Sequence, residues 1–156
     1  MSEKIRKFRS LFKHQSLVGL LSVSSSLETL YNKLTEEEID VLANNNVLFI
    51  RTVSPSSTIK LQDIDVQGIL TLINIDANQF KMLLPEEVIA ILLHEIGHVF
   101  NPNILGIEGE YIADNFAKTK GYAKWIISGL NKGLKNKWIG FEEDEIELRV
   151  TNLREN

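Results

Sequence analysis

The spacing of apolar residues predicts several short helices at the start of the chain. Four apolar residues within 5–12 would lie on one helical face, and six leucines within 17–34 recur at helical intervals and predict helix to about Tyr31. Thr35, followed by three glutamates, is a capping-box pattern that predicts a further short helix ending at Ala43. We therefore expect residues 1–45 to form a group of N-terminal helices.

Two segments in the middle of the chain have the composition of β-strands. Residues 47–53 are rich in β-branched and aromatic side chains and end at a Ser-Pro-Ser-Ser run. Residues 66–76 are rich in Ile, Leu and Thr, and Asn74 and Asp76 alternate with isoleucines, as expected where one sheet face becomes exposed. We expect a small antiparallel or mixed sheet within residues 46–84.

Helical patterns occupy the rest of the chain. Pro85, followed by two glutamates, marks a helix start, and that helix stops before Asn101. A second helical pattern begins at Glu110, a third covers residues 122–134, and an acidic turn opens a last helix within 141–154. We expect residues 85–135 to be a helical core and the 156 residues to form one α+β domain.

The composition narrows the chemistry. The net charge of −4 argues against a protein that binds nucleic acid through a basic surface. The absence of cysteine excludes thiol redox chemistry and cysteine-based metal sites, so that a metal would need the three histidines, Asp and Glu. No apolar run approaches the length of a transmembrane span and no signal peptide is recognisable, so we expect a soluble cytoplasmic protein.

Basic residues are concentrated in the first 14 residues, where five Lys and Arg accompany one Glu. With the apolar face of residues 5–12, this segment could be an amphipathic arm for an anionic surface. The interpretation we favour is a first helix docked on its own domain with its Lys and Arg in solvent.

The helix that starts at Pro85 contains an HExxH signature, His94-Glu95-Ile96-Gly97-His98. His94 and His98 are four residues apart and share one helical face, so both imidazoles can bind one metal ion. Glu95 is turned about 100° around the helix and can act as a general base towards a metal-bound water. Gly97 within the helix suggests close approach of another backbone.

A catalytic zinc needs a third protein ligand, and Glu110 is the preferred candidate. Asp114 lies four residues further on the same helical face and could accept the free ring N–H of His94 or His98. Ala113 and Ala117 are small enough to let the two helices approach. The competing ligand is Glu108, which has no carboxylate four residues on.

These residues resemble the gluzincin metallopeptidases, in which two helices supply His, His and Glu to zinc. Residues 110–117, Gly121-Tyr122 and 130–132 are similar to the catalytic domains of HtpX-type heat-shock proteases and CAAX prenyl proteases. The resemblance implies a zincin-like fold, one Zn²⁺ per chain held by His94, His98 and Glu110, Glu95 as catalytic base, and Asp114 as partner of a histidine ligand.

The match covers residues 85–134, and the chain differs from these relatives elsewhere. The relatives are membrane proteins with a longer interval between the two metal-binding helices. Many of them also carry a His near a later Arg, and this chain has no such His. Residues 146–150 resemble that Arg-containing helix. The resemblance also implies a substrate-pairing edge strand, for which residues 71–75 with Asn74 are the candidate; a core strand would have the same sequence pattern, so both alternatives stay open. Four residues are candidate donors to the oxyanion of the reaction: Tyr111, Tyr122, Arg149 and His14. Of these, Tyr111 and Arg149 are also candidates for substrate binding.

Three functions remain as hypotheses. The first is a soluble zinc metalloendopeptidase acting on a protein or peptide substrate, with no role for nucleic acid and no transmembrane segment. The second is a binding or assembly protein, virus-encoded or virion-associated in one version, that keeps the metal site without catalysis. The third follows from a similarity of residues 110–117 to ImmA-type proteases and phage-encoded peptidases: a regulatory protease that cleaves a repressor. The sequence leaves the oligomeric state undetermined.

Overall fold

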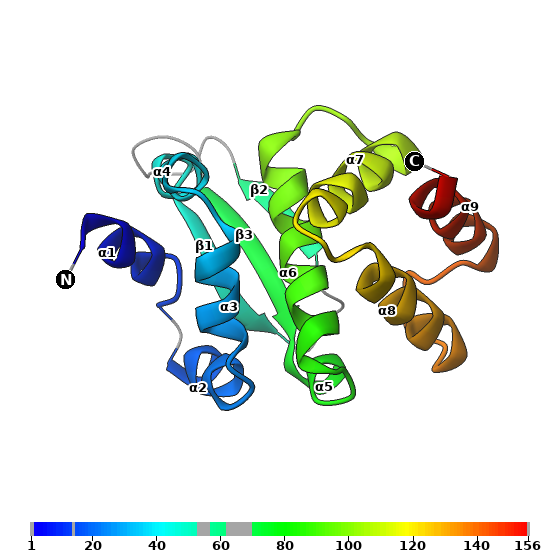
Figure 1. Ribbon diagram of the computed structural model, residues 1–156, viewed down its shortest axis with the longest axis horizontal. Helices are drawn as coiled ribbons and strands as arrows, with labels where there is room; N and C mark the ends of the chain where they lie inside the picture. Colours follow the sequence, from blue (N-terminus) through cyan, green and yellow to red (C-terminus); the bar gives the residue numbers. More distant parts are fainter. Residues whose placement is uncertain (1, 14, 53–56, 62–69, 156) are drawn as a thin grey trace. The chain divides into compact units, whose positions relative to one another are not determined.

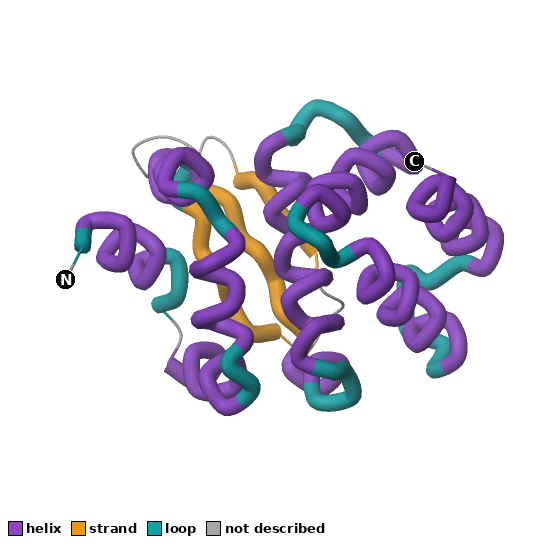
Figure 2. The backbone as a smooth tube through the Cα atoms, in the orientation of Figure 1, coloured by secondary structure: helices purple, strands orange, loops and turns teal. Residues whose placement is uncertain are grey.

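The computed structural model describes residues 2–13, 15–52, 57–61 and 70–155 (Figure 1). The described chain is mostly helical with one small sheet, and it divides into two compact units, Met1–Met82 and Leu83–Asn156. All described strands belong to the first unit, and the second unit is helical (Figure 2). That the chain is a single domain stays a prediction.

The first unit contains the predicted N-terminal helices with one difference. Its helices are α1 (Glu3–Ser10), α2 (Gln15–Val23), α3 (Ser26–Lys33), α4 (Glu36–Asn44) and the short α5 (Ala77–Phe80). The helix predicted over residues 17–31 is interrupted at Ser25, which has a left-handed backbone with φ of 56°. Serine side chains compete for backbone hydrogen bonds, and Ser24 Oγ bonds the carbonyl of Leu21.

The capping box predicted at the start of α4 is confirmed. Thr35 Oγ1 accepts a hydrogen bond from the Glu38 N–H at 3.1 Å, and Glu38 Oε2 accepts one from the Thr35 N–H at 2.8 Å. Two backbone donors that have no partner within the helix are thereby satisfied.

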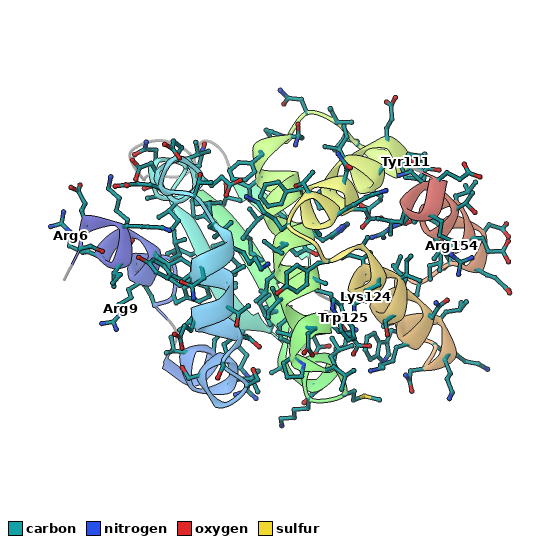
Figure 3. The ribbon with its side chains drawn as sticks, in the orientation of Figure 1. Arg6, Arg9, Tyr111, Lys124, Trp125 and Arg154 are labelled. Carbon is teal, nitrogen blue, oxygen red and sulfur yellow. The ribbon has the colours of Figure 1, made fainter. Side chains whose placement is uncertain are left out.

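Helix α1 is docked on the first unit, as the favoured interpretation predicted. Phe8, Leu11 and Phe12 are buried, and the ring of Phe12 stacks on that of Phe49 at 4.4 Å between centroids. Lys7 pairs with Asp40 of α4 at 2.7 Å. The exposed basic side chains of Arg6 and Arg9 remain on the outer face of α1 (Figure 3).

The sheet is mixed, which is one of the two forms expected from the sequence, antiparallel or mixed. Its strands are β1 (Val47–Thr52), β2 (Ser57–Leu61) and β3 (Leu70–Asp76), and β3 is parallel to β1 and antiparallel to β2. Strand β2 was not predicted, because the preceding Ser-Pro-Ser-Ser run indicates only the end of a strand. Val53 and residues 66–69, which the sequence assigned to strands, lie outside the described residues.

The expectation that residues 71–75 form an edge strand is wrong. β3 lies between the other two strands, with Ile73 in register with Phe49 on one side and Thr58 on the other. Both edges of β3 are therefore already paired within the sheet. Asn74, assigned to substrate binding through that edge, is a buried residue of the first unit.

The second unit contains α6 (Pro85–Phe100), α7 (Gly106–Thr119), α8 (Ala123–Lys135) and α9 (Glu143–Glu155). α6 packs against α7 and α8, and α9 packs against the same two helices (Figure 1). The core of this unit consists of aliphatic side chains from all four helices: Val88, Ile89, Leu92, Leu93, Ile96, Ala113, Ala117, Ile126, Leu130, Ile146 and Leu153. Within the described ranges, no helix is long and apolar enough to cross a membrane.

Gly97 lets the backbones of α6 and α7 approach each other, as its position in the sequence suggested. A Cβ placed on Gly97 would lie 2.7 Å from the Cα and 3.0 Å from the carbonyl oxygen of Ala113, which is itself fully buried. Real Cβ atoms do not approach backbone atoms so closely. The contact between the two helices therefore requires glycine on α6 and a small residue opposite.

Glu87 joins α6 to α8 through a buried carboxylate. It accepts hydrogen bonds from Ser128 Oγ at 2.6 Å, Lys132 Nζ at 2.6 Å and the Leu84 N–H at 2.7 Å. Burial by itself would raise the pKa of Glu87, but the bonds from Lys132, Ser128 and Leu84 outweigh burial and hold the pKa below its ordinary value of 4.5. The ionised carboxylate therefore stabilises the fold.

Replacing Gly97 by Ala tests the close approach. Overpacking costs about 1–3 kcal/mol, more than the gain of up to about 1 kcal/mol in helix propensity, so the free energy of unfolding should fall in urea denaturation. The matched control is Gly19→Ala on α2, where nothing lies within 4 Å of the added Cβ and the fold should be unaffected or stabilised. Equal stability of Gly97→Ala and wild type would contradict this packing.

Replacing Glu87 by Gln tests the buried carboxylate. At pH 7 the loss of charged hydrogen bonds should lower the free energy of unfolding by about 1.5–3 kcal/mol, whereas Glu86→Gln on the exposed side of the same helix should change it little. Because the folded pKa of Glu87 lies below 4.5, its contribution is complete above that pH and disappears as the pH falls through the folded pKa. Unfolding curves at pH 7 and pH 3 should therefore show the gap between variant and wild type narrowing in acid.

Candidate metal centre

Helices α6 and α7 bring three potential metal ligands together. His94 and His98 come from successive turns of α6 and Glu110 from the second turn of α7, and their ligand atoms all lie within 4.8 Å of one another. The two Nε2 atoms are 3.1 Å apart. His94 Nε2 is 3.3 Å from Glu110 Oε2, and His98 Nε2 is 3.3 Å from Glu110 Oε1.

These separations fit one small cation. Donors placed at 2.0–2.1 Å around a tetrahedral zinc ion are roughly 3.3 Å from one another. This is close to the 3.1 Å between the two imidazole nitrogens and to the 3.3 Å from each nitrogen to the Glu110 oxygen that faces it, which is Oε2 for His94 and Oε1 for His98. Two imidazole nitrogens and one carboxylate are also ligand types that zinc accepts. We conclude that His94, His98 and Glu110 form a group that could hold a metal ion.

The structure separates the two candidates for the third ligand. Glu108 is exposed on the first turn of α7 and is not a member of the group. Glu110, two residues on, is half-buried and faces both histidines. Helix α7 begins at Gly106, four residues earlier than the sequence indicated, so both glutamates lie on the helix and its rotation distinguishes them.

Asp114 holds His94 and not His98. Its Oδ1 lies 2.7 Å from His94 Nδ1, and the carboxylate is fully buried. We assign the Nδ1 proton to His94 as donor, since an ionised carboxylate can only accept. When Nε2 loses its proton, that tautomer directs the Nε2 lone pair at the other two ligands, which is the orientation a metal-binding imidazole needs.

His94 and the two carboxylates of the site shift one another's pKa towards the charged forms. Burial by itself would lower the pKa of His94, but hydrogen bonds to Asp114 and Glu110 outweigh it and raise the pKa to about 9. Burial would likewise raise the pKa of Glu110, but its bonds to His94 and His98 hold that pKa far below its ordinary range. Asp114 has a lowered pKa for the same reason, with His94 and Arg149 as its partners. The site thus keeps two carboxylates ionised, and a metal cation would replace the proton at Nε2.

Glu95 is buried beside His94 and is not a member of the metal-binding group. This agrees with its expected place around the helix from His94, where it is not a ligand. Its role as a general base stays a prediction.

The structure surrounds Arg149, a candidate for substrate or oxyanion binding, with carboxylates. Its Nε and Nη2 donate to the two oxygens of Asp114 at 2.9 and 2.8 Å, and its Nη1 lies 2.8 Å from Glu110 Oε2. Glu145, one turn earlier on α9, is further away, at 3.8 Å from Arg149 Nη1. Sequence reasoning missed these partners because residues 110 and 149 lie on different helices. The available signal was Asp114, because a carboxylate expected between two packed helices needs a cationic partner.

The other candidates occupy varied positions. Tyr111 is partly exposed on α7 next to Glu110 (Figure 3). Tyr122 is buried at the N-terminal end of α8, and this burial, with the charge of Glu86, raises its pKa. His14 lies outside the described residues. Their roles as oxyanion donors stay predictions.

Comparison with known proteins adds no relative: no family model, curated protein or solved structure matches the chain.

Metal content of two glutamate variants tests the ligand assignment. We expect about one zinc ion per chain in protein purified without an affinity metal, as measured by mass spectrometry. Glu110→Ala should lose that zinc because two imidazoles alone bind it weakly, whereas the neighbouring Glu108→Ala should retain it. Zinc retained by Glu110→Ala and lost by Glu108→Ala would reverse the assignment, and no zinc after reconstitution of the wild type would refute the site.

Proposed function

We propose that the chain is a zinc-dependent metalloendopeptidase. The observation that carries the proposal is the convergence of His94, His98 and Glu110 at separations suited to one tetrahedral ion. Two histidines and one glutamate are three protein ligands, which is the number a catalytic zinc site uses when it keeps one position open. A structural zinc site would instead use four protein ligands.

The arrangement of the remaining polar groups supports catalysis over simple metal storage. Asp114 fixes the tautomer and orientation of His94. Glu95 directly follows His94 in an HExxH helix, the sequence context of a general base in zinc peptidases. The resemblance of residues 85–134 to gluzincin peptidases of the HtpX and CAAX protease type points to the same residues and the same roles.

These positions suggest a separate role in peptide hydrolysis for the metal ion, for Glu95 and for the three ligands. When bound, zinc would lower the pKa of a water molecule towards about 7 and polarise the carbonyl of the scissile bond. Glu95 would accept a proton from the attacking water and then donate it to the leaving amine. His94, His98 and Glu110 would supply only one negative charge, so the centre would keep net positive charge that favours a developing oxyanion.

Glu95→Gln separates catalysis from metal binding. Loss of the general base should reduce hydrolysis of an unfolded protein such as casein by about 10²–10⁴-fold, while zinc content and thermal stability stay those of wild type. Glu86→Gln, an exposed change on the same helix, is the matched control and should retain activity.

Two results would contradict the proposal. Equal hydrolysis by Glu95→Gln and wild type would show that the activity does not arise from this site. A zinc-loaded wild type that cleaves neither denatured proteins nor a mixed peptide library would instead favour a binding or assembly role for the metal centre.

A further inference from the structure

Arg149 is a buried cation that one helix contributes to a site built by two others. It lies on α9, and its guanidinium contacts two carboxylates of α7. All three of its nitrogens contact a carboxylate. Nε and Nη2 form a two-point contact with Asp114, and Nη1 contacts Glu110. Lysine, with a single ammonium on a flexible stem, could not reproduce this pattern.

The contact with Glu110 determines how that carboxylate can serve a metal. Arg149 Nη1 lies 2.8 Å from Oε2, which is also 3.3 Å from His94 Nε2, and Oε1 lies 3.3 Å from His98 Nε2. A glutamate side chain has several rotamers, and this one retains 26% exposure. With Oε2 held by the guanidinium, the carboxylate stays turned towards both histidines, where a metal ion would bind.

We propose that Arg149 is a positioning residue of the metal centre, which orients Glu110 and makes the docking of α9 part of metal binding. This inference rests on the proposed metal centre and does not require peptidase activity. Helix α9 otherwise docks through Ile146 and Leu153 and through a bond from Lys118 Nζ to the Leu153 carbonyl at 3.0 Å. Because Arg149 also contacts the ligand Glu110, metal binding and α9 docking stabilise each other by linkage.

Charge and positioning predict opposite effects on affinity. A guanidinium near a divalent cation repels it, so if charge alone mattered, Arg149→Gln would bind zinc more tightly. If Arg149 acts by orienting Glu110, the same change weakens binding. Arg149→Lys keeps the charge and loses the fork, so it weakens binding only under the positioning role.

Zinc dissociation constants measured by chelator competition on the full chain decide between these effects. We expect Arg149→Gln and Arg149→Lys each to weaken binding by about 10–100-fold, as for other residues that orient metal ligands. The control is Arg154→Gln, an exposed position at the end of the same helix (Figure 3), which should bind zinc as wild type does. Unchanged or tighter binding by both Arg149 variants would overturn the proposal.

A second measurement needs no variant and covers the case in which a change at Arg149 prevents folding. In hydrogen exchange of wild type, zinc should slow exchange of the α9 amides as well as those of α6 and α7. Zinc-independent exchange in α9, with protection confined to α6 and α7, would overturn the linkage. If zinc binds and both results hold while no peptide is cleaved, only the peptidase proposal fails. A wild type that binds no zinc refutes the metal centre itself.

Discussion

The second unit depends on the burial of one carboxylate. Asp114 has no exposed surface, and its two oxygens are shared between His94 of α6 and Arg149 of α9. A buried charge is strongly unfavourable unless it is paired and hydrogen-bonded. The three helices must therefore meet at this point. Loss of Arg149 would leave Asp114 without its permanent cation, and loss of His94 would remove a hydrogen bond from Asp114 Oδ1. The ligand geometry around His94 and Glu110 follows from that meeting.

Close backbone packing and the polar site are two aspects of one arrangement. At a close approach of α6 and α7, Gly97 faces Ala113, and neither contributes a long side chain. The histidines on either side of Gly97 and the carboxylates on either side of Ala113 can then reach across to each other. Larger residues at the contact would separate the helices, and ligand separations of 3.1–3.3 Å would be lost.

The charges are arranged so that a cation fits without rebuilding the site. With His94 protonated, as its pKa of about 9 implies at neutral pH, two cationic and two anionic groups compensate one another: His94 and Arg149 against Glu110 and Asp114. A divalent ion would take the place of the proton on His94 and raise the total by one charge. The carboxylates are ionised before any ion arrives, which is the state that metal binding requires.

Local sequence patterns determined the helices and the ligand candidates. The spacing of His94 and His98 and the capping box at Thr35 depend on neighbours within one turn, and the structure contains both as predicted. The strand β2, the central place of β3 and the partners of Arg149 depend on contacts between distant segments, which no local pattern encodes. The choice of Glu110 over Glu108 lay between these cases, because the sequence favoured Glu110 but only the packing of α7 on α6 turns Glu110 towards the two histidines. The sequence alone thus determined which residues could take part, and tertiary packing decided which of them meet.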